Sequence, residues 1–246
     1  MRIAILTDIH ANREAFEAVL ADARAREAER IVLLGDLVGY GPDPEWCCDL
    51  ALRLVTEGAT CVRGNHDHAA AGAPEPMSAL AKAAMDWTRT RLSDTQRAFL
   101  GNLPLIVDEG DLCFVHASAS DPGAFSYVTS DTRAAPSFRA TKARLIFCGH
   151  THVPLLASSD LGGMVRQQEF KANLAIPLLR SRRWLAVVGA VGQPRDGVPQ
   201  AGWAMLDTVT NELTFRRTSY DIPRTAEKIR AAGLPEALAL RLLKGN

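Results

Sequence analysis

Short apolar runs alternate with longer amphipathic segments in the first part of the chain, and this alternation limits the fold more than any other feature. The run at 3–6 is followed by a stretch with apolar residues at helical spacing (12–29) and then by a second run at 31–34. A Gly/Pro loop, an amphipathic stretch at 45–57 and a third run at 59–62 repeat this order. Strands joined by helical crossovers pair in parallel, with right-handed connections and both faces buried. The pattern therefore predicts an α/β fold on a buried parallel sheet.

The middle of the chain continues this pattern with less regular spacing. Residues 74–101 have a broken apolar stripe that predicts a helix interrupted near Ser93. Two further apolar runs, 112–118 and 144–152, each lead into histidine. We therefore expect two more buried strands after the helical stretch.

The sequence pattern changes in the last part of the chain. From Leu155 onward the turn spacing and β-branched content are typical of antiparallel strands, and 223–246 is expected to be a helix broken at Gly233. No internal repeat or low-complexity linker interrupts the chain, so we expect a single domain over 1–246.

Composition excludes several classes of protein. Lys plus Arg equals Asp plus Glu at 28 each, so no net positive field attracts nucleic acid or an anionic membrane. The amino terminus has the pattern of a strand and not of a signal peptide, and no run approaches the ~18 apolar residues of a membrane span. The five cysteines form no C-x-x-C pair, which favours reduced thiols in the cytoplasm.

Residues that commonly bind metals stand at or just past the carboxyl end of the apolar runs. In an open α/β sheet these ends meet along one edge, where ligands bind. One such histidine alone would more simply be hydrogen-bonded or solvated, but five of the six histidines fall in these segments. The residues at the run ends are Asp8, Asp36, Asn65, His116 and His150, and the five histidines are His10, His66, His116, His150 and His152.

The chemical types in this set indicate divalent ions. Carboxylate, amide oxygen and imidazole without thiolate suit Mn, Fe, Co or Zn in a catalytic site better than a structural zinc. Seven candidates are too many for one ion and about right for two that share a carboxylate. Two ions roughly 3.5–4 Å apart can share a hydroxide and hold a phosphoryl group, with a nearby histidine as proton donor. The seven candidates are Asp8, His10, Asp36, Asn65, His116, His150 and His152.

Five motifs in order resemble the calcineurin-like metallophosphoesterase superfamily. They are DIH (8–10), GD (35–36), GNHD (64–67), VHAS (115–118) and GHTH (149–152). The later segment VGQPRDG (191–197) resembles one in a bacterial branch of small phosphoesterases and dinucleoside tetraphosphatases. The resemblance implies an αββα sandwich, in which two packed mixed β-sheets are flanked by helices.

The resemblance also implies a role for each residue. Asp36 would bridge two divalent ions, with Mn or Fe expected first and Zn, Co or Ni as alternatives. His66 would be the general acid that protonates the leaving group, and Asp67 would orient its ring. The implied ligands are Asp8, His10, Asp36 and His152 for one ion, and Asp36, Asn65, His116 and His150 for the other.

Three glycines support the site independently of the family. Gly35, Gly64 and Gly149 each stand next to a candidate ligand or one residue away from it. A chain that leaves a strand there must turn sharply and bring its backbone close to the site, which glycine permits.

Five other residues have two interpretations each. Asn12 could bind a substrate phosphate or cap a helix, and Arg195 could pair with a phosphate or belong to a turn. His68 could touch substrate or lie in a solvated helix turn. Tyr40 and Trp46 could stack on a nucleobase or cover the helix that follows.

The sequence as a whole predicts a metal-dependent hydrolase of phosphomonoesters or phosphodiesters that works by attack of a metal-bound hydroxide. Hydrolysis of symmetrical dinucleoside polyphosphates, such as diadenosine tetraphosphate, is the narrower alternative. A binding scaffold of the same fold is the other alternative, although all ligand positions and His66 are filled. We expect a small phosphate-ester or nucleotide substrate and no membrane partner, with no strong signal for nucleic acid; the oligomeric state is left open.

Overall fold

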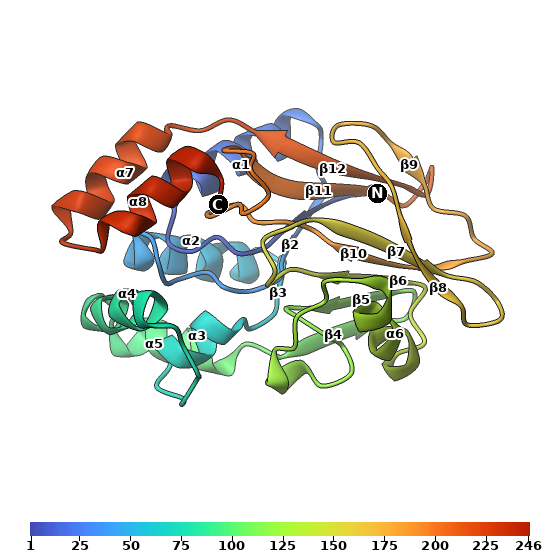
Figure 1. Ribbon diagram of the computed structural model, residues 1–246, viewed down its shortest axis with the longest axis horizontal. Helices are drawn as coiled ribbons and strands as arrows, with labels where there is room; N and C mark the ends of the chain where they lie inside the picture. The colour runs from blue at the N-terminus through green and yellow to red at the C-terminus, as the bar shows by residue number, and fades with distance from the viewer.

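The computed structural model describes residues 1–246 as two mixed six-stranded β-sheets packed face to face, with helices on the outer sides (Figure 1). The first sheet has the order β3-β2-β1-β11-β12-β9, and the second β4-β5-β6-β10-β7-β8. This architecture confirms the expected sandwich. The first sheet contains β1 (Arg2–Leu6), β2 (Arg30–Leu33), β3 (Thr60–Cys61), β9 (Ile176–Pro177), β11 (Ala201–Asp207) and β12 (Glu212–Thr218). The second contains β4 (Ile106–Glu109), β5 (Leu112–Val115), β6 (Leu145–Cys148), β7 (Leu155–Ser159), β8 (Val165–Gln168) and β10 (Arg183–Val187).

Alternating side chains of the central strands fill two different cores. Ile3 and Ile5 of β1 belong to the cluster between the sheets, together with Phe147 of β6. Ala4 and Leu6 belong to the cluster under the helices. Since each such strand is buried on both faces, its sequence is a continuous apolar run. Each fully buried Ile or Leu side chain contributes about 1.5–3 kcal/mol to folding.

Five of the eight helices begin at a residue whose side chain accepts a hydrogen bond from a free amide of the first turn. The Gln96 backbone amide donates a hydrogen bond to Ser93 Oγ, and the Ser93 backbone amide donates one to Gln96 Oε1, which explains the predicted break. Helices α1 and α2 cover the first sheet, and α6 contacts the second. The helices are α1 (Arg13–Ala25), α2 (Pro44–Thr56), α3 (Asn65–Ala70), α4 (Ala79–Arg91), α5 (Asp94–Asn102), α6 (Asp131–Ala140), α7 (Ile222–Ala231) and α8 (Glu236–Lys244), with a 3-10 turn η1 at Pro122–Ala124.

Some expected elements are wrong in detail. Residues 74–78 are not helical, because the helix starts after its cap, Ser78. Strand β10 lies beyond Leu155 yet pairs in parallel with β6, although it is antiparallel to β7. Strand β4 and helix α6 were not expected; α6 contains Pro136, which in a sequence usually indicates a break.

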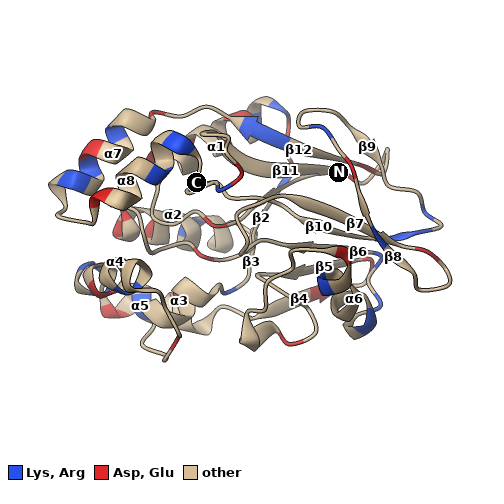
Figure 2. Cartoon of the chain, viewed as in Figure 1, with Lys and Arg blue, Asp and Glu red and all other residues tan.

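The C-terminal segment forms a helical hairpin, with the chain turning at Gly233, whose φ is +70°. Its apolar residues, including Leu238 and Leu242, pack with Tyr40 and with Ala84 of α4. None of the helices has both the length and the apolar character that a membrane crossing requires. Basic and acidic residues alternate along the chain in Figure 2 without gathering on one element, as the balanced composition leads one to expect.

Candidate metal centre

The structure brings the seven predicted ligands to one edge of the sandwich, in the loops that follow β1, β2, β5 and β6 and at the start of α3. All seven are buried; the most exposed, Asn65, retains 8% of its surface. Three groups have ligand atoms within 4.8 Å of one another, and Asp36 belongs to two of them. These groups are Asp8, His10 and His152; His10, Asp36 and His66; and Asp36, His116 and His150.

One pair of imidazoles faces nitrogen to nitrogen. His10 Nε2 lies 3.0 Å from His152 Nε2. The Nδ1 atoms of the two rings are 3.2 and 2.6 Å from the carbonyl oxygens of Val38 and Gln193, so Nδ1 of each ring carries the proton. Two unprotonated nitrogens then point at each other, with Asp8 Oδ1 3.4 Å from His152 Nε2. Such an arrangement is repulsive by itself and suits a cation between the donors.

The second pair has similar geometry. His116 Nε2 lies 3.1 Å from His150 Nδ1, and His116 Nδ1 donates to the Leu34 carbonyl at 2.7 Å. Asp36 Oδ2 is 3.4 Å from His116 Nε2 and 3.6 Å from His10 Nε2. Asp36 thus stands between the two histidine pairs.

Two buried oxygens of the site have no hydrogen-bond partner, namely Asp8 Oδ1 and Asn65 Oδ1. A buried polar atom without a partner is costly, by about 1–3 kcal/mol, unless a ligand satisfies it. The five cysteines are buried elsewhere and offer no thiolate. The donor set therefore fits divalent ions that prefer oxygen and imidazole.

The backbone is strained at the same residues. Of the eleven non-glycine residues with positive φ, five are predicted ligands: Asp8, His10, Asp36, His150 and His152, with φ from 49° to 68°. Non-glycine residues adopt this conformation at a cost, and such residues concentrate at functional sites.

The predicted close approach at the three glycines is confirmed. A Cβ on Gly149 would lie 2.0 Å from Thr7 Oγ1 and 2.6 Å from Asp8 Oδ2, and one on Gly64 would lie 2.1 Å from Asp36 Oδ1. Gly35 has a φ of +90° and contacts the backbone of Gly64. A side chain at Gly64 or Gly149 would displace a candidate ligand, and one at Gly35 would displace the backbone of Gly64.

Burial and neighbouring charges set the protonation of the ligands. Burial alone would raise the pKa of Asp36, but the charge of the neighbouring His116, the largest opposing cause, holds it well below its usual value. Burial lowers the pKa of His10 and His152. Asp36 is therefore charged and these two imidazoles are neutral, which are the forms that bind metal.

His66 and Asp67 do not form the predicted pair. Asp67 Oδ1 accepts a hydrogen bond from the Leu37 amide at 2.8 Å, and Oδ2 accepts one from the Gly64 amide at 3.0 Å. His66 Nδ1 has no partner. The prediction that Asp67 orients the His66 ring is therefore wrong; Asp67 instead holds the start of α3 against the loop after β2.

Of the three residues considered as substrate ligands, Asn12, His68 and Arg195, only Arg195 lines the cavity over the candidate ligands. Asn12 caps α1 through the Ala15 amide and donates to the Gly192 carbonyl, so its helix-cap interpretation is confirmed and its side chain is not free for substrate. Arg195 lines the cavity at the metal centre.

The other residues with two interpretations, His68, Tyr40 and Trp46, differ in how close they lie to the site. His68 is half-buried on α3 with its ring 5.9 Å from that of Phe125. Tyr40 lies against His10 and His66, whereas Trp46 packs on Phe16 away from the site.

The cavity over the centre has a volume of about 270 Å³. Besides candidate ligands and His66, it is lined by Tyr127 from the loop after β5 and by Arg195 and Arg241. The sequence analysis did not single out Tyr127 or Arg241; an arginine within the apolar pattern of α8 was the available signal for the latter.

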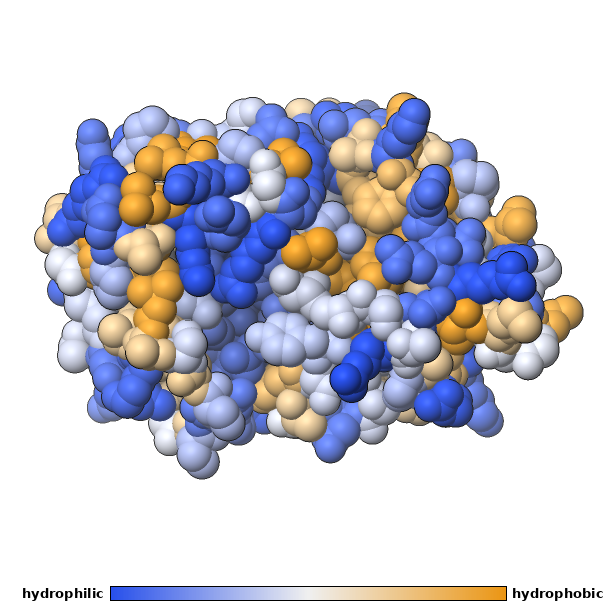
Figure 3. All heavy atoms as spheres, in the orientation of Figure 1, coloured by the Kyte–Doolittle hydropathy of each residue, from blue (hydrophilic) through white to orange (hydrophobic).

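A second cavity of about 630 Å³ adjoins the cavity over the candidate ligands, since Asn65, Tyr127 and His150 line both cavities. Figure 3 shows a hydrophilic hollow left of the centre of the molecule, below the C-terminal helices.

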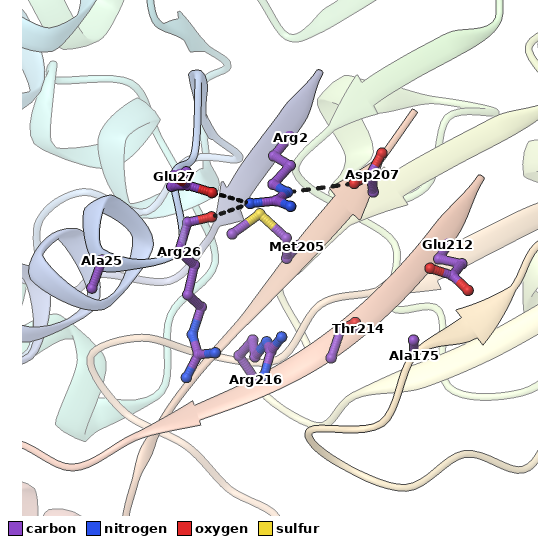
Figure 4. Close-up of a pocket in the computed structure, with 10 residues that line it drawn as sticks. All are labelled: Arg2, Ala25, Arg26, Glu27, Ala175, Met205, Asp207, Glu212, Thr214 and Arg216. Atoms are coloured by element: carbon purple, nitrogen blue, oxygen red, sulfur yellow. Dashed lines mark hydrogen bonds and ion pairs between the residues drawn. The ribbon is translucent and has the colours of Figure 1, made fainter. Parts of the chain in front are cut away.

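Another pocket, of about 430 Å³, lies on the outer side of the first sheet and differs in character (Figure 4). In this pocket Arg2 pairs with Glu27 and Asp207, so the charge of Arg2 is neutralised by groups of the protein itself. It contains none of the candidate ligands, and we therefore place the functional site at the carboxyl ends of the strands.

Comparisons with known proteins agree with this geometry. The family model for the calcineurin-like phosphoesterase superfamily domain matches residues 1–211. The uncharacterized protein MJ0912 of Methanocaldococcus jannaschii is 34% identical over 250 residues, covering 99% of this chain and 98% of that protein. The crystal structure of a metallophosphoesterase from Sphaerobacter thermophilus is 38% identical, with a TM-score of 0.88 over 100% of both chains. The hypothetical protein PH1004 from Pyrococcus horikoshii OT3 has the same fold, with a TM-score of 0.79 and 19% identity over 100% of this chain and 98% of that one. The chain therefore belongs to the calcineurin-like phosphoesterase superfamily.

Proposed function

We propose that the protein hydrolyses small phosphate esters at a centre of two divalent ions bridged by Asp36. The observation that carries this proposal is the position of Asp36 Oδ2 between two facing imidazole pairs, within 3.6 Å of a nitrogen from each. One ion would be held by Asp8, His10, Asp36 and His152, and the other by Asp36, Asn65, His116 and His150.

When bound, two such ions activate water as a nucleophile and neutralise the oxygens of the phosphoryl group. His66 lines the same cavity and is not needed as a ligand, so it is available to protonate the leaving group. Its Nδ1 is pressed against Gly39, where a Cβ would lie 2.3 Å away. Nε2 is then the nitrogen left to deliver the proton.

The surroundings of the centre favour a small substrate over a long polyanion. The two adjoining cavities have volumes of only about 630 and 270 Å³, and Arg195 adds a positive charge beside the candidate ligands. Mono- and diesters therefore both suit the site, and dinucleoside polyphosphates are the narrower alternative. We further propose Mn or Fe as the resident metal and the cytoplasm as the location.

A substrate panel tests this proposal. Chelator-treated protein is reconstituted with Mn and assayed with p-nitrophenyl phosphate, bis-p-nitrophenyl phosphate and diadenosine tetraphosphate, comparing kcat/KM for each. We expect hydrolysis that requires metal and is lost in Asp36→Asn. Protein that binds metal but hydrolyses none of the panel would favour the binding-scaffold alternative.

His66→Ala tests the proton donor, with His68→Ala as its matched control on the same helix. We expect His66→Ala to keep its metal and lose about 10²-fold or more in kcat, the usual contribution of a general acid. His68 lines neither cavity, so its variant should stay within about threefold of the wild type. Loss of metal from His66→Ala would instead make this histidine a ligand.

A further inference from the structure

Two arginines at the metal centre have no carboxylate partner. Arg195 Nη2 donates to the neutral Oε1 of Gln193 at 2.8 Å, and its guanidinium lies 5.5 Å from the centroid of the Tyr40 ring. Arg241 also lines the cavity and forms no ion pair. What distinguishes these two arginines is their position, since both line the cavity over the candidate ligands.

The two arginines are held in place by linked segments. The Gly197 amide, two residues after Arg195, donates to the Gly245 carbonyl at 2.8 Å, and the Gly245 amide donates to the Arg241 carbonyl at 2.8 Å. Leu242, next to Arg241, packs in one cluster with Tyr40. The C-terminal hairpin, which lies beyond the residues matched by the family model, thus brings Arg241 to the side of the cavity occupied by Arg195.

Holding two like charges together costs free energy, and neither arginine forms an ion pair. Burial lowers the pKa of Arg241, and the charge of Arg195 lowers it further. The one carboxylate that lines the cavity, Asp36, lies beside His10 and His116. A bound anion would remove this repulsion, and the planar guanidinium matches phosphate oxygens in paired hydrogen bonds.

The size of the cavity admits more than one phosphoryl group. Its volume of about 270 Å³ corresponds to about nine water molecules at roughly 30 Å³ each. A single phosphate has five heavy atoms, and two linked phosphoryl groups have nine. Because the metal centre neutralises the group that is hydrolysed, the arginines are available to a neighbouring one.

We propose that Arg195 and Arg241 bind a second phosphoryl group of the substrate, next to the one that is hydrolysed. This inference rests on the proposed function and narrows its substrate class to compounds with adjacent phosphoryl groups, such as nucleoside di- and polyphosphates. Simple monoesters would be hydrolysed with lower kcat/KM because they leave the arginine pair unoccupied.

Binding of two analogues that are not hydrolysed tests the inference. Methylenebisphosphonate has two anionic groups and methylphosphonate has one, and their affinities for Mn-loaded protein without free Mn are measured by isothermal titration calorimetry. The variants are Arg241→Gln, which keeps most of the side chain's length, and Lys244→Gln, which removes an exposed charge from the same helix. Thermal melts check that both variants are folded.

We expect the wild type and Lys244→Gln to prefer the bisphosphonate, and Arg241→Gln to lose about 10- to 100-fold in affinity for it alone, the effect of one charge-assisted contact. Equal weakening of both analogues would assign the arginine to the hydrolysed group and overturn the inference. An unchanged preference in Arg241→Gln would also overturn it. Since these measurements need no turnover, they are independent of the outcome of the substrate panel.

Discussion

Replacing Gly39 with alanine should disable His66 without touching a metal ligand. Gly39 has a φ of +88°, and an added Cβ would lie 2.3 Å from His66 Nδ1. Ordinary contacts between heavy atoms are about 3.5–4.0 Å, so the ring must move by more than about 1 Å. A displacement of this size at a reacting group costs about 10²-fold in rate. The positive φ adds about 1–2 kcal/mol of strain.

The strain and the clash can be separated by a matched variant. Gly58 has a φ of +102°, and a Cβ there would meet no atom within 4 Å. Gly58→Ala therefore carries the backbone strain alone. Gly58→Ala should lower the Tm by about 2–8 °C, given the usual shift of about 2–4 °C per kcal/mol for a chain of this size, and Gly39→Ala should lower it further because of the clash.

The assay compares kcat for p-nitrophenyl phosphate and phenyl phosphate, together with metal content. Gly39→Ala should lose about 10²-fold in kcat with full metal content, and more with phenyl phosphate, because a poorer leaving group depends more on the proton donor. Gly58→Ala should keep the wild-type kcat. A fully active Gly39→Ala, or an equal loss in Gly58→Ala, would refute the reasoning.

Three further predictions concern the metal centre and its support. Adding Mn to chelator-treated protein at about 100 times its Kd should stabilise the fold by about 2.7 kcal/mol per site, raising the Tm by about 5–10 °C for each site filled; an unchanged melt would contradict metal binding. Asp67→Asn should cost about 1–3 kcal/mol, because the amide can accept only one of the two backbone hydrogen bonds; lost activity with an unchanged Tm would restore a role in orienting His66. Burial raises the pKa of Asp8 to about 7, so below pH 7 a proton competes with metal and the Mn affinity should fall by about tenfold per pH unit; calorimetry that finds equal affinity at pH 6 and 8 would exclude this competition.

The sequence predicted the positions of the candidate ligands because they depend on a local rule. Residues that follow buried parallel strands meet at one edge of the sheet, and Asp8, Asp36 and His150 do so in the structure. The same reasoning predicted the close backbone approach at Gly64 and Gly149.

Orientation within the site could not be predicted in the same way. Asp67 follows His66 directly on α3, and neighbouring residues on a helix point about 100° apart. Adjacency in the motif suggested a contact that helical geometry prevents. Arg241 was missed for a different reason. Only the packing of the C-terminal hairpin on Tyr40 brings it to the cavity, and such a long-range contact cannot be inferred from the local sequence.

The central claim is that two metal ions share Asp36, and anomalous diffraction from crystals of the Mn-loaded protein tests it most directly. The account predicts two Mn peaks per chain, one contacting His10 and His152 and the other contacting His116 and His150, with Asp36 between them. A single peak, or two peaks with Asp36 bound to only one, would contradict it.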